Sequence, residues 1–165
     1  MDVDGVLTDG SLFHWLAPTG KLVELKGLNA QDGISLVWLV ENGVKTGVIS
    51  GRSSEGLEAR ARELRMSFVV QGKVHKVPEY ERILKESGLR PEETAFIGDD
   101  IQDIPLLRRV GWAVAVANAR PEVKAAADTV TRASGGRGAV REAAEILLKS
   151  QGRWDGILKK FEASR

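Results

Sequence analysis

The sequence predicts an α/β fold built on a parallel, doubly wound (Rossmann-like) sheet. Short runs of apolar residues alternate along the chain with longer stretches of helical periodicity. The apolar runs lack the polar alternation of a half-exposed strand, so they are typical of strands that are buried on both faces. Several of the helical stretches close on a glycine, which signals the end of a helix.

Strands and helices are expected in strict alternation through the body of the chain. The strands are expected at residues 44–49, 68–70, 94–97 and 112–116. The helices are expected at residues 33–41, 55–65, 78–87 and 103–110. Such alternation places helices on both faces of one parallel sheet.

Two segments depart from this alternation. Residues 11–25 are predicted to form a projecting β-hairpin, because two apolar runs flank the turn sequence Ala-Pro-Thr-Gly. Residues 138–165 are predicted to form a C-terminal helical tail, with one helix to about residue 150 and another over 154–161. The intervals from Asp9 to Ser50 and from Ser50 to Lys76 are too short for a cap domain, which is an inserted domain that covers an active site. We therefore expect a single domain over residues 1–165.

The composition excludes several classes of function. The formal net charge of +1 gives no reason to expect a nucleic-acid partner. The sequence contains no run of about 18 apolar residues, so no membrane span is predicted. It also does not open with a basic-then-apolar leader, so no secretion signal is expected. The sequence has no cysteine, which excludes disulfides, thiolate metal ligands and a cysteine nucleophile. These features are typical of a protein of the reducing cytoplasm.

Polar clusters follow the predicted strands at the points where the strands end. These clusters are Asp-Val-Asp-Gly at 2–5, Ser-Gly-Arg at 50–52, Lys76, and Gly-Asp-Asp at 98–100. In a doubly wound sheet, ligands bind in the crevice outside the carboxyl ends of the strands. We therefore expect the four clusters to converge on one site.

The residue types at this site predict phosphate chemistry. Asp2, Asp4 and Asp99 bring together carboxylates whose repulsion calls for a hard cation such as Mg²⁺. An aspartate anion can then attack a phosphate whose charge is neutralised, and it forms an aspartyl-phosphate. A second carboxylate can protonate the leaving oxygen and later activate water. Ser50 offers a hydroxyl and nearby N–H groups to phosphate, and Lys76 can clamp phosphate and nucleophile together.

In this order, the motifs resemble those of the haloacid dehalogenase (HAD) superfamily of phosphatases. The string at residues 2–10, with Gln-Asp-Gly at 31–33 and Gly-Gly-Arg-Gly-Ala-Val-Arg-Glu at 135–142, is similar to the 3-deoxy-D-manno-octulosonate 8-phosphate (KDO 8-phosphate) phosphatase family. This resemblance implies hydrolysis of a phosphorylated sugar acid, foremost KDO 8-phosphate, within lipopolysaccharide biosynthesis. It also implies a homotetramer, in which hairpins and tails shape the neighbouring sites.

The resemblance also implies residue roles. Asp2 is the implied nucleophile and Asp4 the implied general acid and base, with Mg²⁺ held by Asp2, the Asp4 carbonyl and Asp99. The other implied roles are phosphate binding by Ser50, Gly51 and Lys76, sugar-acid contacts by Arg52 and Arg60, and support of metal and lysine by Asp100 and Asp103. Two positions depart from the family pattern. Only Met1 precedes Asp2, whereas relatives have several apolar residues there that form the central strand. We therefore expect a shortened central strand, or else a sequence that is truncated or begins at the wrong residue. Gln31 stands where relatives carry Arg or Lys.

Alternative interpretations remain open for substrate and class. A related phosphatase could act on a nine-carbon, sialic-acid-type 9-phosphate. A non-catalytic, receiver-like phosphoacceptor would also use acidic residues, a serine and a lysine on a doubly wound sheet, but it would gain nothing from Asp4 as a resident base. The glycine-rich segment 135–138 lacks a strand–turn–helix context, so it is expected to be a flexible hinge rather than a dinucleotide site. Apolar groups on both faces of the hairpin, among them Phe13 and Trp15, predict burial against another subunit.

Overall fold

The sheet at the centre of the fold is parallel, as predicted, and the start of the chain joins its two halves. This computed structural model describes residues 1–163. The elements in chain order are β1 (Phe13–Leu16), β2 (Leu22–Leu25), α1 (Ala30–Glu41), β3 (Gly47–Ile49), α2 (Glu55–Glu63), β4 (Phe68–Val70), α3 (Val77–Ser87), β5 (Ala95–Gly98), α4 (Ile104–Leu107), β6 (Trp112–Ala115), α5 (Pro121–Ala125), β7 (Thr129–Val130), α6 (Ala139–Ser150) and α7 (Trp154–Lys160). Single 3₁₀ turns, η1 (Pro91–Glu93) and η2 (Ile101–Asp103), precede β5 and α4.

Backbone hydrogen bonds define the strand order. Strand β3 pairs in parallel with β4, and β6 pairs in parallel with both β5 and β7. Between β3 and β5 lie Met1 and Asp2: Ile49 N–H donates to the Met1 carbonyl at 3.0 Å, and Asp2 N–H donates to the Ile97 carbonyl at 2.9 Å. The order across the sheet is therefore β4, β3, Met1–Asp2, β5, β6 and β7, and the predicted doubly wound architecture is confirmed.

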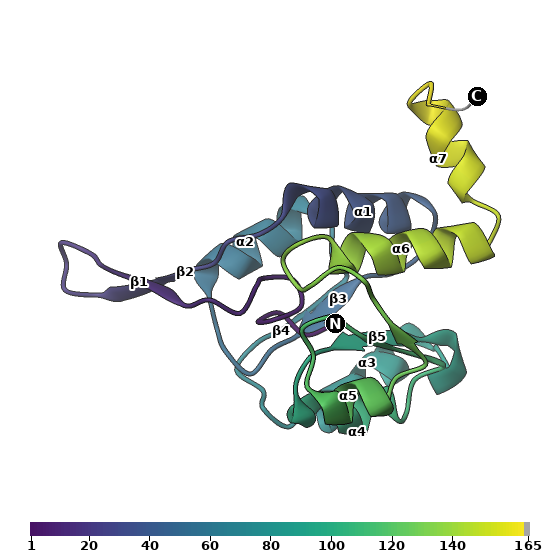
Figure 1. Cartoon of the computed structure of the whole chain (residues 1–165). Coiled ribbons are helices and arrows are strands. Elements are labelled where there is room, and N and C mark those ends of the chain that lie inside the picture. Colours follow the sequence, from purple (N-terminus) through teal and green to yellow (C-terminus); the bar gives the residue numbers. More distant parts are fainter. Residues whose placement is uncertain (164–165) are drawn as a thin grey trace.

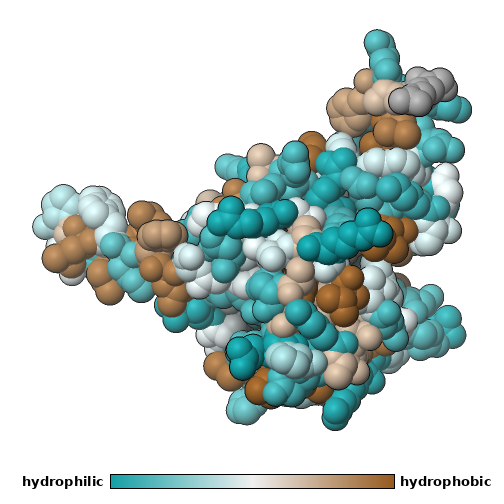
Figure 2. All heavy atoms as spheres, viewed as in Figure 1, coloured by the Kyte–Doolittle hydropathy of each residue, from teal (hydrophilic) through white to brown (hydrophobic). Residues whose placement is uncertain are grey.

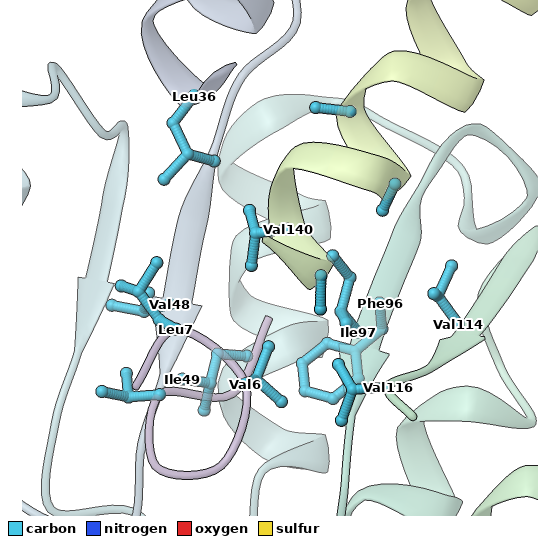
Figure 3. Packing of buried hydrophobic residues seen from close by; sticks show 14 of the residues in the cluster. Val6, Leu7, Leu36, Val48, Ile49, Phe96, Ile97, Val114, Val116 and Val140 are labelled. Carbon is cyan, nitrogen blue, oxygen red and sulfur yellow. The ribbon is translucent and has the colours of Figure 1, made fainter. Parts of the chain in front are cut away.

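Helices cover both faces of this sheet (Figure 1). Helices α1, α2 and α6 lie on one side, whereas α3, α4 and α5 lie on the other. Apolar side chains from strands and helices meet in the core, where Leu36 of α1 and Val140 of α6 face Ile49 and Ile97 of the sheet (Figure 3). The buried carboxylate of Asp32 in α1 accepts hydrogen bonds from the backbone N–H groups of Gly138 and Arg141, so it fastens the start of α6 to α1.

The central strand position is occupied by Met1 and Asp2 over the length of only two residues. A cavity of about 580 Å³ lies beside Met1 between the two half-sheets, and apolar side chains such as Leu39 and Phe96 line it. Residues 44–46 flank the cavity, and the strand predicted from residue 44 begins only at Gly47, opposite Met1.

The hairpin projects from the body, and the tail forms two helices (Figure 1). Strands β1 and β2 pair antiparallel, with Phe13 opposite Leu25, which confirms the predicted hairpin. Its side chains form an exposed apolar surface (Figure 2), made up of Leu12, Phe13, Trp15, Leu16, Leu22 and Leu25. Helices α6 and α7 match the predicted tail over the described residues, and positions 164 and 165 of that tail lie outside them.

Helices α4 and α5 and strand β7 also differ from the prediction. Helix α4 is short, because the 3₁₀ turn η2 takes up the residues before Ile104. Helix α5 and strand β7 were not predicted, although Pro121 occupies the first helical position where proline is favoured. Among the described residues, no helix combines the length and the apolar character that crossing a membrane requires.

Candidate active site

Three of the four predicted polar clusters line one cavity outside the carboxyl ends of the strands, and the fourth, Lys76, contacts the lining residue Asp2. The volume of this cavity is about 490 Å³. The residues that line it are Asp2, Asp4, Gly5, Asp9, Gly10, Ser50, Gly51, Arg52, Val74, Asp99, Asp100, Gln102 and Asn118. The cavity thus brings together residues that lie as far apart in the sequence as Asp2 and Asn118.

A buried lysine underlies the floor of this cavity. The Nζ atom of Lys76 lies 2.8 Å from Oδ1 of Asp2 and 2.6 Å from Oδ1 of Asp103, and all three side chains are nearly inaccessible. The second carboxylate oxygen of Asp103 accepts hydrogen bonds from the backbone N–H groups of Asp99 at 3.0 Å and Asp100 at 3.3 Å. Asp103 therefore fixes both Lys76 and the turn that follows β5.

A cluster of carboxylates beside Lys76 suits a divalent cation. Oxygen atoms of Asp2, Asp99 and Asp103 lie within 4.8 Å of one another. Burial raises the pKa of Asp99 to about 7, and the carboxylates of Asp2, Asp103 and Asp100 add to this effect. Burial, followed by Asp103, also raises the pKa of Asp2. Oδ1 of Asp99 is buried without a hydrogen-bond partner among the described residues, so it is a free oxygen ligand for a hard cation.

Gly5 lets the first loop approach Asp99. Its φ of +87° is in the left-handed region, and a Cβ atom at this position would lie 2.1 Å from Oδ2 of Asp99. The turn that contains Gly5 is closed by the Val3 carbonyl, which accepts hydrogen bonds from the N–H groups of Leu7 and Thr8, each at 2.9 Å. This turn brings Asp4 to the cavity, where Oδ1 of Asp4 forms an ion pair with Lys26.

Ser50 and Arg52 stand on the loop that follows β3. Ser50 is buried, and its Oγ accepts a hydrogen bond from the Arg52 N–H at 3.2 Å. The helix after this loop, α2, begins at Glu55, and Ser54, not Ser50, accepts the capping bond from its first turn. The N–H donors near Ser50 are therefore loop amides rather than those of a helix N-terminus.

Two of the predicted site residues lie away from the centre of the cavity. Arg60 does not line it: this side chain lies on α2, pairs with Glu63 at 2.8 Å and approaches Gly33 of α1. Asp100 lies at the rim, and its carboxylate accepts a hydrogen bond from the Ile101 N–H at 2.7 Å at the start of η2.

Asn118 is a cavity residue that the sequence analysis missed. Its side-chain amide donates to the Gly5 carbonyl at 3.0 Å and accepts from the Gly135 N–H at 2.6 Å. The glycine-rich segment, predicted to be a hinge, is packed instead against the first loop, because a Cβ on Gly135 would lie 1.8 Å from the Gly5 carbonyl oxygen. Asn118 follows β6, so the same strand-end rule that found the other residues applies to it.

Fold and site together define a class of protein. HAD-like hydrolases combine a parallel, doubly wound sheet with an Asp-x-Asp loop, a serine, a lysine and an acidic pair beyond the strand ends, and this chain has all of these features. Residues 63–143 match the model of the haloacid dehalogenase-like hydrolase family.

Comparison with individual proteins narrows this class. The chain is 38% identical over 155 residues to the KDO 8-phosphate phosphatase of Escherichia coli K12, covering 94% of this chain and 80% of that one. The KDO 8-phosphate phosphatase of Moraxella catarrhalis, solved with a magnesium ion, a phosphate ion and KDO, superimposes with a TM-score of 0.92 at 36% identity, over 98% of this chain and 90% of that one. A cobalt-bound phosphatase from Haemophilus influenzae superimposes with a TM-score of 0.85 at 37% identity, over 92% and 86% of the two chains. The chain belongs to the KDO 8-phosphate phosphatase family, and it is a phosphoric monoester hydrolase of the HAD type.

Proposed function

We propose that this protein hydrolyses KDO 8-phosphate by a Mg²⁺-dependent mechanism with an aspartyl-phosphate intermediate. The observation that carries the proposal is the buried contact of Lys76 with Asp2 beside the free carboxylate oxygen of Asp99. This arrangement supplies an oriented carboxylate nucleophile next to a cation site. The substrates named for the E. coli and M. catarrhalis relatives support the choice of sugar acid.

In the first step, a carboxylate oxygen of Asp2 attacks the phosphorus atom. A bond forms between this oxygen and phosphorus, the bond to the sugar oxygen breaks, and its electron pair goes to that leaving oxygen. Asp4 transfers a proton to the leaving oxygen, so that the sugar acid departs as a neutral alcohol. The hydroxyl of Ser50 and the Gly51 N–H are the groups that we assign to the phosphate oxygens.

In the second step, water opens the aspartyl-phosphate. Asp4, now a carboxylate, accepts a proton from the water as its oxygen attacks phosphorus, and the bond from phosphorus to Asp2 breaks. Phosphate leaves, and both aspartates return to their initial states. Lys76 holds the oxygen of Asp2 in place throughout and offsets the charge that collects near it.

The carboxylates of Asp2 and Asp99 and the backbone carbonyl of Asp4 are the groups that would hold a cation. We assign Mg²⁺ to this position, where its charge would neutralise the phosphate oxygens. Asp103, which already binds Lys76 and two backbone N–H groups, is assigned a supporting role, and so is Asp100 at the rim. The unpaired oxygen of Asp99 supports this assignment, because burial without a partner is costly for a carboxylate.

We further propose that the chain acts as one capless domain in a cytoplasmic homotetramer. Arg52 at the cavity rim is assigned to the acid group of the sugar, and Arg60 remains a predicted contact to the sugar acid. A cavity without a cap domain leaves a small substrate exposed, and the exposed apolar hairpin offers a surface for a neighbouring subunit (Figure 2).

A substrate panel tests the proposal. The kcat/KM values would be measured with Mg²⁺ for KDO 8-phosphate, a nine-carbon sialic-acid-type 9-phosphate and p-nitrophenyl phosphate, and again after chelation. We expect KDO 8-phosphate to be the best substrate and chelation to abolish turnover of all three. Preference for the nine-carbon ester would reassign the substrate. Stable phosphorylation of the protein without turnover would instead identify a receiver-like phosphoacceptor.

A further inference from the structure

A chain of alternating charges links the hairpin to the active site. Glu24 on β2 and Lys26 just beyond it are two residues apart, so their side chains share one face of the strand. Lys26 pairs with Oδ1 of Asp4 on one side and lies 2.8 Å from Oε1 of Glu24 on the other. Oε2 of Glu24 in turn accepts a hydrogen bond from Nε of Arg52 at 3.0 Å and pairs with its Nη2.

The Lys26 and Glu24 side chains in this series of ion pairs are largely buried. The Lys26 side chain is 3% exposed and that of Glu24 is 12% exposed, although both belong to a hairpin whose apolar side chains are largely in solvent. A buried lysine without a partner would be strongly destabilising, so the ammonium group of Lys26 is confined to the space between its two carboxylates. The hydrogen bond from Arg52, followed by the contact with the Lys26 ammonium group, lowers the pKa of Glu24 to about 2, so Glu24 is ionised at neutral pH.

We propose that Lys26 is a positioning residue for Asp4 and that Glu24 fixes the positions of the Lys26 and Arg52 side chains. Asp4 stands on a loop, and its carboxylate could rotate about two side-chain torsions if no partner held it. With Oδ1 held by Lys26, the other oxygen is directed for proton exchange with the leaving group, and such alignment is a large part of general acid catalysis. This inference rests on the proposed role of Asp4 as general acid.

A purely structural role for Lys26 would have a different signature. Anchoring of the hairpin would affect small esters such as glycerol 3-phosphate and p-nitrophenyl phosphate alike, because both need the same folded site. Positioning of a general acid lowers kcat/KM, which reports the first step, only for esters whose leaving oxygen needs a proton; the later role of Asp4 as base affects kcat for all esters. An alkyl phosphate such as glycerol 3-phosphate needs this proton, whereas p-nitrophenyl phosphate releases a phenolate that is stable without it. The ratio of the two kcat/KM values therefore separates the explanations.

The test compares this ratio in wild type, Lys26→Met, Lys26→Arg, Asp4→Asn and Lys21→Met. Lys26→Met keeps the length of the side chain and removes its charge. We expect it to lower kcat/KM for glycerol 3-phosphate at least about tenfold more than for p-nitrophenyl phosphate, since a general acid contributes roughly 10²–10⁴-fold. Lys26→Arg should recover most of the ratio. Lys21→Met is the matched control. Lys21 lies on the hairpin and forms an exposed ion pair with Glu55 of α2, so this substitution should leave both kcat/KM values unchanged.

Asp4→Asn tests the role of Asp4 as general acid separately from the positioning role of Lys26. If Asp4→Asn shows the leaving-group dependence and Lys26→Met lowers both substrates equally, Lys26 does not position Asp4. If Asp4→Asn itself shows no such dependence, the assignment of Asp4 as general acid is overturned, and the role of Lys26 with it. If Lys26→Met does not fold, the same ratio is measured on Lys26→Gln, which also removes the charge but keeps a polar side-chain end, and a loss equal on both substrates likewise overturns the proposal.

Discussion

The ammonium group of Lys76 lies 2.8 Å from the Asp2 carboxylate, and both side chains are buried. Removal of this charge would leave the carboxylates of Asp2 and Asp103 facing each other. We expect Lys76→Met to lower the free energy of unfolding at pH 7 by about 3 to 5 kcal/mol, as for other buried pairs that lose one partner. Urea denaturation measures this change. Lys73→Met, at an exposed lysine, should cost less than about 1 kcal/mol. Equal stability of the two variants would contradict the importance of the buried pair.

The nucleophile is tested by Asp2→Asn. The amide has nearly the size of the carboxylate but does not attack phosphorus, so turnover should fall by more than roughly 10³-fold. Circular dichroism should show an intact fold, because asparagine adds no bulk and removes a repulsion with Asp99. Asp155→Asn, on exposed α7, serves as the control and should keep full activity. Substantial turnover by Asp2→Asn would reassign the nucleophile.

Asp99 couples stability to pH and to metal. Its pKa is raised to about 7 in the folded protein, from 3.8 in its unperturbed state. The folded state therefore binds more protons at Asp99 between these values, so the contribution of this group to the stability of the metal-free protein should fall as pH rises from about 4 to 7. Mg²⁺ competes with that proton, so its stabilising effect should be larger at pH 8 than at pH 5. Thermal unfolding with Mg²⁺ and with chelator at both pH values measures this.

Asp99→Asn should separate stability from metal binding. At pH 8 the substitution removes a buried negative charge, and the metal-free variant should melt roughly 2 to 8 °C above the wild type, since each kcal/mol shifts Tm by about 2–4 °C. The same variant should lose its response to Mg²⁺. A lower Tm in the metal-free state, or an unchanged Mg²⁺ response, would show that Asp99 is not a repelled cation ligand.

The apolar hairpin should govern assembly. Phe13 is 60% exposed and Trp15 is 53% exposed, so both are available to a neighbouring subunit. Replacing both with serine should weaken association, because each buried aromatic would forfeit roughly 2 to 3 kcal/mol. Sedimentation should show smaller species, and turnover of KDO 8-phosphate should fall more than that of p-nitrophenyl phosphate. Leu89→Ser, away from the hairpin, is the control. A monomeric variant with unchanged selectivity would show that the chain completes its own site.

Local patterns predicted most of the fold. Strand β4 was predicted to the residue, whereas α1 begins at Ala30, before the predicted residue 33. The signal for this start is Asn29, whose side chain accepts hydrogen bonds from the N–H groups of Gln31 and Asp32. Strand β7 was missed because it has only two residues, and its pairing with β6 depends on tertiary structure.

The convergence of the site could be predicted because it follows from topology. Asp2, Ser50, Lys76 and Asp99 lie after successive positions in a parallel sheet, whose carboxyl ends meet at one edge. The pairing of Lys26 with Asp4 does not follow from topology, since it depends on how the hairpin leaves the sheet. The capping of α6 by Asp32 likewise depends on which helices become neighbours.

The contact of Gly135 and Asn118 with Gly5 has a consequence for biosynthesis. A nascent chain leaves the ribosome from its N-terminus, so the loop that carries Asp2 and Asp4 emerges before the residues that pack against it. Its packing partners at positions 118 and 135 emerge only after most of the chain has been synthesised. Until then the first loop lacks the amide and the glycine backbone that close over it. The enzyme therefore acquires its catalytic geometry near the end of translation, and a ribosome stalled before residue 118 would present an inactive phosphatase.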